Sequence, residues 1–61
     1  MRPHEVQVFR GGDGRWFWRR RAGNYKIVAA SEQGHRSRWY AVRKARRANP
    51  GVSVVVIDGD A

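Results

Sequence analysis

Arginine and aromatic side chains alternate along one short segment of this chain, and these two residue types together can bind nucleic acid. Residues 15–21 read RWFWRRR. Successive side chains of a strand point to opposite faces, so a strand here would place one set on a single face: Arg15, Phe17, Arg19 and Arg21. Guanidinium groups pair with phosphates, and aromatic rings stack on bases. This face is therefore the first candidate nucleic-acid contact. The alternatives are a solvated face on which arginine stems shield Phe17, or a contact with a protein.

A second cluster of cations falls where the sequence predicts a helix. Arg43, Lys44 and Arg47, with Arg46 beside them, would lie on the side of the helix that faces away from the sheet. Trp39 and Tyr40 flank them. This helix face is the second candidate for phosphate contact, although a charged helix face is commonly only solvated. If the helix covers one face of the sheet and the arginine strand face is the other, a single ligand cannot lie across the centres of both clusters. Two protomers could bring the clusters together.

The groups needed for catalysis or metal binding are sparse. The chain has no cysteine, its serines are few, and His4 and His35 are far apart in sequence. The glycine turn at 11–14 does not open a helix, as a phosphate loop must. Asp58 and Asp60 alone are too few ligands for a metal. We therefore expect no catalytic residue, no metal site, no cofactor and no enzymatic function.

The charge of the chain points to a polyanionic partner. Thirteen Lys and Arg residues stand against five Asp and Glu, which gives a formal net charge of +8. Only Lys26 and Lys44 are lysines, and arginine is the residue better suited to bidentate phosphate contacts. A basic balance of this size predicts DNA or RNA as a partner. The alternative is that the coding composition of a GC-rich genome inflates arginine without a functional reason.

The length of 61 residues allows one domain, with a core over about 5–57. A chain this short buries only about 60% of its unfolded surface and usually needs a staple. Disulfides and thiolate metal sites are excluded, so oligomerisation is the staple we expect. No apolar run approaches the length of a membrane span, and the first residues lack a signal core. We therefore expect a soluble cytoplasmic protein that does not contact membranes.

Hydrophobic periodicity and turn residues predict the order β-β-β-α-β. The strands are expected at 5–10, 15–21, 25–31 and 52–57, and the helix runs from a Ser37 N-cap to about Ala48, with a frayed tail at 58–61. The resulting fold class is α+β, an antiparallel sheet with one helix packed on one face. Trp16 and Trp18 are expected in the core under the helix, beside Val6, Val8 and Ala45.

The final strand is apolar on both faces. A strand of this kind should be buried on both sides, but a single chain has only one helix to offer. A second copy would resolve this, so a homodimer is expected, and its interface would be formed by Val52, Val54, Val55, Val56 and Ile57.

Four segments together resemble the YegP-like family of small bacterial proteins: 13–19 (DGRWFWR), 22–24 (AGN), 26–29 (KIVA) and 31–38 (SEQGHRSR). The similarity covers roughly residues 5–57. It implies a β(3)-α-β unit that occurs as tandem repeats or as two subunits, which share one sheet and exchange their C-terminal strands. Because only one unit is present here, the implied form is a homodimer. The family resemblance implies a fold and an assembly but does not imply an activity.

Together these features predict a small basic homodimeric binding module that contacts nucleic-acid phosphates with little sequence preference. The alternative, from another class, is a protein-interaction module of unknown role whose basic surface meets an acidic protein. Binding that weakens steeply with salt would favour the first, and a complex that survives nuclease treatment would favour the second.

Overall fold

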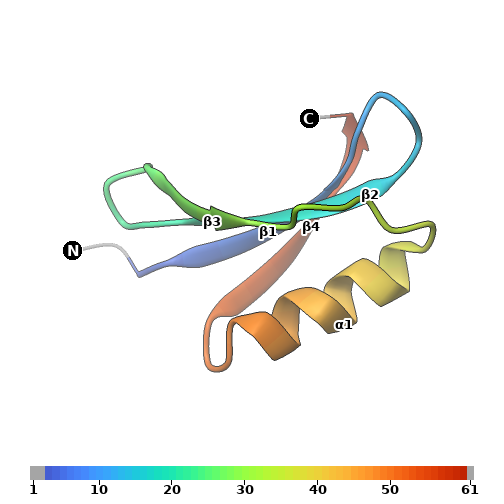
Figure 1. Ribbon diagram of the computed structural model, residues 1–61. Coiled ribbons are helices and arrows are strands. Elements are labelled where there is room, and N and C mark those ends of the chain that lie inside the picture. Colours follow the sequence, from blue (N-terminus) through green and yellow to red (C-terminus); the bar gives the residue numbers. More distant parts are fainter. Residues whose placement is uncertain (1–2, 61) are drawn as a thin grey trace.

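The computed structural model describes the backbone of residues 3–60 and the side chains of residues 3–57. One helix lies against one face of a four-stranded sheet (Figure 1). The elements follow in the order β1 (Glu5–Arg10), β2 (Trp16–Arg21), β3 (Ile27–Ala30), α1 (Arg38–Ala48) and β4 (Ser53–Asp60). The predicted α+β class and the order β-β-β-α-β are thus confirmed.

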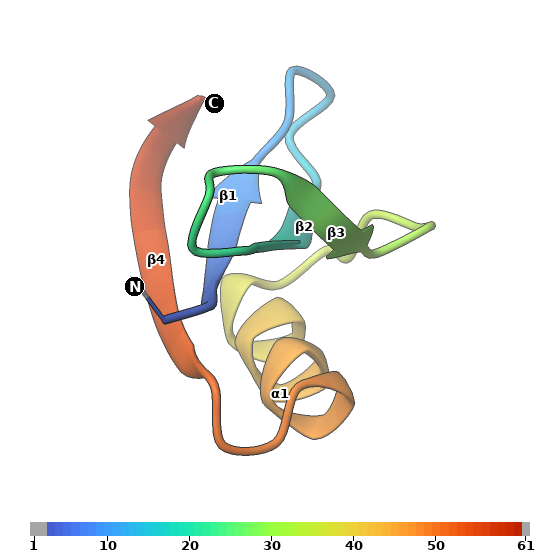
Figure 2. The ribbon, with the colours of Figure 1, turned by 90° about the vertical axis from the view of Figure 1, so that its left-hand side faces the viewer.

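The sheet is mixed, so the prediction of a wholly antiparallel sheet was wrong. Its strand order is β3-β2-β1-β4, with β1–β2 and β2–β3 antiparallel and β1–β4 parallel. The reason is topological. In a three-strand meander, β1 and β3 run in the same direction, and a helix that crosses one face returns the chain to that direction. Figure 2 shows β4 along the edge of the sheet beside β1.

Two strand ends differ from the prediction by more than one residue. Tyr25, expected to open the third strand, has a φ of 68° and belongs to a turn in which its N–H donates to the Ala22 carbonyl. A left-handed residue cannot continue a strand, so β3 begins at Ile27. The predicted frayed tail at 58–60 is instead part of β4, because β1 extends far enough for Arg10 to pair with Asp60. Ala61 lies outside the described residues.

The helix begins and ends where the sequence predicted. The Ser37 hydroxyl accepts a hydrogen bond from the Tyr40 N–H, and Asn49 caps the other end. The Asn49 side chain is almost fully buried, donates to the Ala45 carbonyl and accepts from Arg20 of β2. This contact ties the C-terminal end of α1 to the sheet. No helix among residues 3–60 is of a length and apolarity that could traverse a bilayer.

Small residues let the helix approach the sheet closely. Val6 and Val8 of β1 and Ala41 and Ala45 of α1 are fully buried. Larger residues surround this core and are partly buried against it, namely Trp16, Trp18, Val42, Val52 and Val54. The two tryptophans pack against this core, but they are only partly buried at its margin, so the prediction that they are core residues under the helix is confirmed only in part.

The last strand is an edge strand, paired with β1 on one side. Val54 and Val56 lie opposite Val6 and Val8, on the helix side of the sheet. Val55 and Val56 are each 40% exposed. In the single chain, β4 is therefore not buried on both faces.

Candidate nucleic-acid interface

The sheet face that points away from α1 carries three of the four residues in the first predicted cluster. Phe17, Arg19 and Arg21 of β2 lie there opposite Phe9, Gln7 and Glu5 of β1. Phe9 and Phe17 stack with ring centroids 6.0 Å apart, and the Arg19 guanidinium lies 4.7 Å from the centre of the Phe9 ring. These side chains therefore pack against one another and cover the open face of the sheet.

The two strand arginines are engaged in a chain of polar contacts. Arg19 Nε donates to Gln7 Oε1 at 2.8 Å, and Gln7 Nε2 donates to Glu5 Oε1 at 3.1 Å. Gln7 is only 7% exposed, so Arg19 satisfies a nearly buried acceptor. Arg21 pairs with Glu5 at 3.5 Å. Both guanidinium groups thus bridge neighbouring strands rather than extend into solvent.

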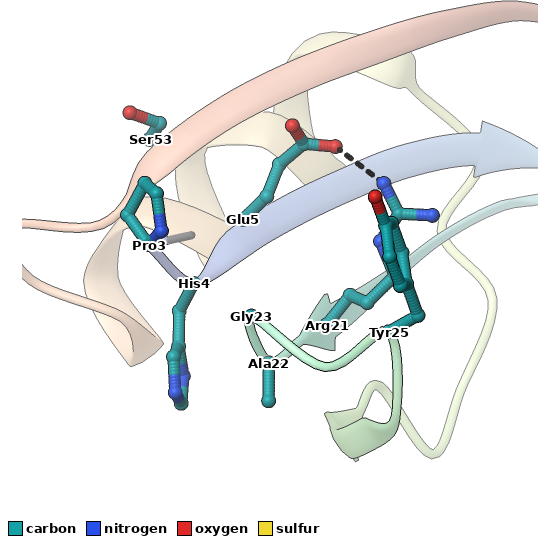
Figure 3. A pocket seen from close by; sticks show the side chains of 8 residues that line it. All are labelled: Pro3, His4, Glu5, Arg21, Ala22, Gly23, Tyr25 and Ser53. Atoms are coloured by element: carbon teal, nitrogen blue, oxygen red, sulfur yellow. Dashed lines mark hydrogen bonds and ion pairs between the residues drawn. The ribbon is translucent and has the colours of Figure 1, made fainter. Parts of the chain in front are cut away.

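A small cavity lies at the end of this chain of contacts. Its volume is about 190 Å³, and Glu5, Arg21, Tyr25 and Ser53 are among its lining residues. Figure 3 shows the Glu5–Arg21 ion pair and the Tyr25 ring beside the guanidinium, which lies 5.1 Å from the ring centre. The cavity's charged groups neutralise each other.

Arg15, the fourth residue of the predicted strand face, lies outside β2. It is in the hairpin turn, with its side chain about half exposed and 4.0 Å from Asp13. The structure therefore does not gather the predicted set into one open row of cations. One member is in a turn, two are held by β1, and Phe17 is partly buried.

The outward side of α1 has a different character. Arg43, Lys44 and Arg47 are exposed and, together with Tyr40, line a shallow hollow of about 120 Å³. Trp39 is 69% exposed and Tyr40 is 44% exposed. Arg43 lies 5.7 Å from the centre of the Trp39 ring, and Lys44 lies 5.5 Å from that of Tyr40. Cations and aromatic rings are thus side by side on an open surface, which we call the helix surface: Trp39, Tyr40, Arg43, Lys44 and Arg47.

Among the residues with described side chains, Glu32 is the carboxylate that lies nearest the helix surface along the chain, and it lines a pocket with Lys44 without forming an ion pair. The sequence has no acidic residue between Glu32 and Asp58, whereas residues 33–57 contain six Lys and Arg residues. Among the residues with described side chains, none forms an ion pair with Arg43, Lys44 or Arg47. Arg43 and Arg47 are four residues apart on one helix, where like charges repel by a few tenths of a kcal/mol. The helix surface thus carries an electrostatic cost that an anionic ligand would remove.

The segment between β3 and α1 is hydrogen-bonded to β2, an arrangement that the sequence analysis did not predict. Trp16 and His35 exchange two backbone hydrogen bonds of 2.7 Å, and the N–H of Ser31 donates to the Trp18 carbonyl at 2.9 Å. The Trp18 N–H in turn donates to the Ser31 hydroxyl. These contacts join residues far apart in the sequence and have no local pattern. His35 is partly buried, and its ring and that of Tyr40 meet edge to face with their centroids 5.1 Å apart.

The roles of the two arginine sets can be separated by stability measurements. We expect Arg19→Met to lower the free energy of unfolding by about 1–3 kcal/mol, because the nearly buried Gln7 oxygen loses its donor. Arg43→Met removes the same charge from an exposed helix position and should change stability by about 0.5 kcal/mol or less. Urea unfolding followed by far-UV circular dichroism measures both. Equal stability of the two variants would contradict a structural role for Arg19.

Comparisons of the chain with models of known families, with curated proteins and with solved structures find no significant match. The resemblance to the YegP-like family therefore stays a prediction, and the function has to be argued from the surfaces described above.

Proposed function

We propose that this chain is a small basic binding module, acting as a homodimer, that holds nucleic acid by its phosphates with little sequence preference. The observation that supports it most directly is the helix surface, where three exposed cations lie beside two exposed aromatic rings and form no ion pair with any described carboxylate. Phosphate contacts are electrostatic and carry no sequence information, so weak preference among sequences is expected.

The sheet face supports this function less well than the sequence suggested. Arg19 and Arg21 already donate to Gln7 and Glu5, so a phosphate would have to displace existing partners. Arg43 and Arg47 have no such partner to give up among the described side chains. The proposal therefore assigns phosphate contact to α1 and not to the strand cluster, of which Arg15 is the exposed member in the hairpin turn.

The proposal predicts a charge effect that depends on position. We expect micromolar or tighter binding to random-sequence DNA and RNA near physiological ionic strength. The double variant Arg43→Gln/Arg47→Gln should weaken binding about tenfold or more and reduce the slope of log affinity against log salt by about 2. The double variant Arg15→Gln/Lys26→Gln removes the same net charge and should have a much smaller effect. Fluorescence anisotropy with labelled oligonucleotides across a salt series measures both.

Two results would contradict this assignment. Equal losses in the two double variants would mean that net charge, not the helix surface, governs binding. No binding by the unaltered protein at physiological salt would leave the charge without a nucleic-acid role. Capture of an acidic protein in a complex that resists nuclease would then favour the protein-interaction alternative.

The homodimer is proposed from β4. Val55 and Val56 are half-exposed on an edge strand, and an apolar edge favours pairing with another chain. The connection from α1 to β4 is short, residues 49–52, and short connections favour the exchange of an element between protomers. In an exchanged dimer, each β4 would pair with β1 of the partner, and the second unit would cover these valines.

Light scattering tests the dimer. We expect a mass twice that of the 7.0 kDa chain at micromolar concentration. Val55→Lys should lower the measured mass toward that of the monomer, because a charge on the edge strand opposes burial there. Val28→Lys introduces the same charge at an exposed position on the opposite edge and should leave the mass unchanged. A monomeric mass for the unaltered protein would contradict the dimer.

A further inference from the structure

A groove runs beside the helix surface, between α1 and the segment that follows β3. Its volume is about 360 Å³, at the lower end of the range for small-ligand sites. Trp18 is an aromatic wall of this groove, with His35 and Lys44 nearby and the small side chains of Ala30 and Ala48 at its sides. Because these two alanines fill little space, part of the Trp18 side chain is left uncovered at the margin of the core.

The wall of the groove opposite α1 is preorganised. Ser31 is bonded to Trp18 through both its backbone N–H and its hydroxyl, and His35 is bonded to Trp16 through two backbone contacts. Glu32 and Gln33 lie between these two anchors and also line the groove. Their oxygens can accept hydrogen bonds from amino groups, and the Gln33 amide can also donate. An aromatic wall beside such groups matches the face and the edge of a nucleobase.

The groove and the helix surface are continuous. Lys44 lines both the groove and the hollow formed with Arg43 and Arg47, and Tyr40 contacts His35 across the boundary. A base in the groove would therefore have its phosphates next to Arg43 and Arg47, with Lys44 between them and Glu32 of the groove. The cations of the helix surface suit a polyanion, and the aromatic wall of the groove suits a base. A ligand that fits both is a polyanion with an unpaired base.

We propose that this groove takes an unpaired base of a single-stranded nucleic acid whose phosphates lie along Arg43, Lys44 and Arg47. The inference rests on the proposed function and deepens it, because it selects single strands over duplexes. The bases of a duplex are paired and stacked inside the helix, so a duplex offers the helix surface phosphates alone.

Electrostatics and base capture predict opposite preferences. A duplex has a higher density of phosphates and releases more counterions for each contact than a single strand. A protein that contacted only phosphates should therefore bind the duplex at least as tightly. Base capture predicts that a single strand binds about tenfold more tightly, since one base stacked on an aromatic side chain contributes on that scale.

The test compares labelled oligonucleotides of about 15 nucleotides, single-stranded or as the matching duplex, in DNA and RNA forms. Competition anisotropy at fixed ionic strength gives the ratio of affinities. A preference of about tenfold for the single strand in both sugar forms supports the groove. A preference confined to RNA would instead indicate recognition of the 2′-hydroxyl and would overturn base capture as the cause.

A variant that fills the groove makes the test specific. Ala48→Met leaves the net charge unchanged, and methionine, like alanine, is a good helix former. We expect this variant to bind the single strand no more tightly than the duplex, with the affinity for the duplex unchanged. Ala29→Met makes the same exchange at an exposed position outside the groove lining and should preserve the preference. Equal single-strand and duplex affinities in the unaltered protein would overturn the groove proposal and leave phosphate binding standing. If the unaltered protein binds neither the single strand nor the duplex, both the groove proposal and the proposed phosphate binding are overturned.

Discussion

The close packing of Ala41 and Ala45 on Val6 and Val8 is the contact on which the remaining structure depends. Among residues 3–57, these four small or medium side chains form the fully buried hydrophobic core, and burial of apolar surface is the main force that holds so short a chain together. Small residues at this contact bring α1 near the sheet and leave no room for the two large indoles between them. Trp16 and Trp18 are therefore displaced to the margin, where one of them becomes a wall of the groove.

The same packing divides the arginines into two populations. On the open face of the sheet no second layer covers β1 and β2, so arginine stems and guanidinium groups cover Phe9 and satisfy Gln7 and Glu5. On α1 the inward side is occupied by alanines, and Arg43, Lys44 and Arg47 are exposed on the outward side, where none of the carboxylates with described side chains forms an ion pair with them. Arginine is thus a structural bridge on one side of the molecule and an uncompensated charge on the other. We assign function to the uncompensated side, because bound phosphate improves the electrostatics there.

Local patterns predicted the elements well, and long-range contacts limited the rest. The alternation at Trp16 and Trp18, the Ser37 cap and the end of the helix near Ala48 each depend on near neighbours, and all were predicted. The parallel pairing of β4 with β1 is set by the path of the chain through the three-strand meander and the helix, and no local pattern indicates it. The left-handed Tyr25 lacks the usual glycine or asparagine signature.

The candidate site was predictable in composition but not in arrangement. The cations and aromatic rings of α1 share one outward surface, as their helical spacing indicated. The strand arginines had the right spacing for a binding face, but the sequence could not show that Gln7 and Glu5 would engage them. Pairing across strands depends on register, which is set by the whole sheet. The tie between His35 and Trp16 is of the same kind, and so the groove it supports was not predicted.

In the proposed complex α1, and not the arginine-bearing strand β2, meets the nucleic acid. A titration of isotopically labelled protein with a short single-stranded oligonucleotide, followed by amide NMR, distinguishes the two elements. We expect shifts concentrated at residues 39–47 and 30–35, with small changes along 16–21. Shifts concentrated along 16–21, with α1 unchanged, would contradict this expectation and would return phosphate binding to the open face of the sheet.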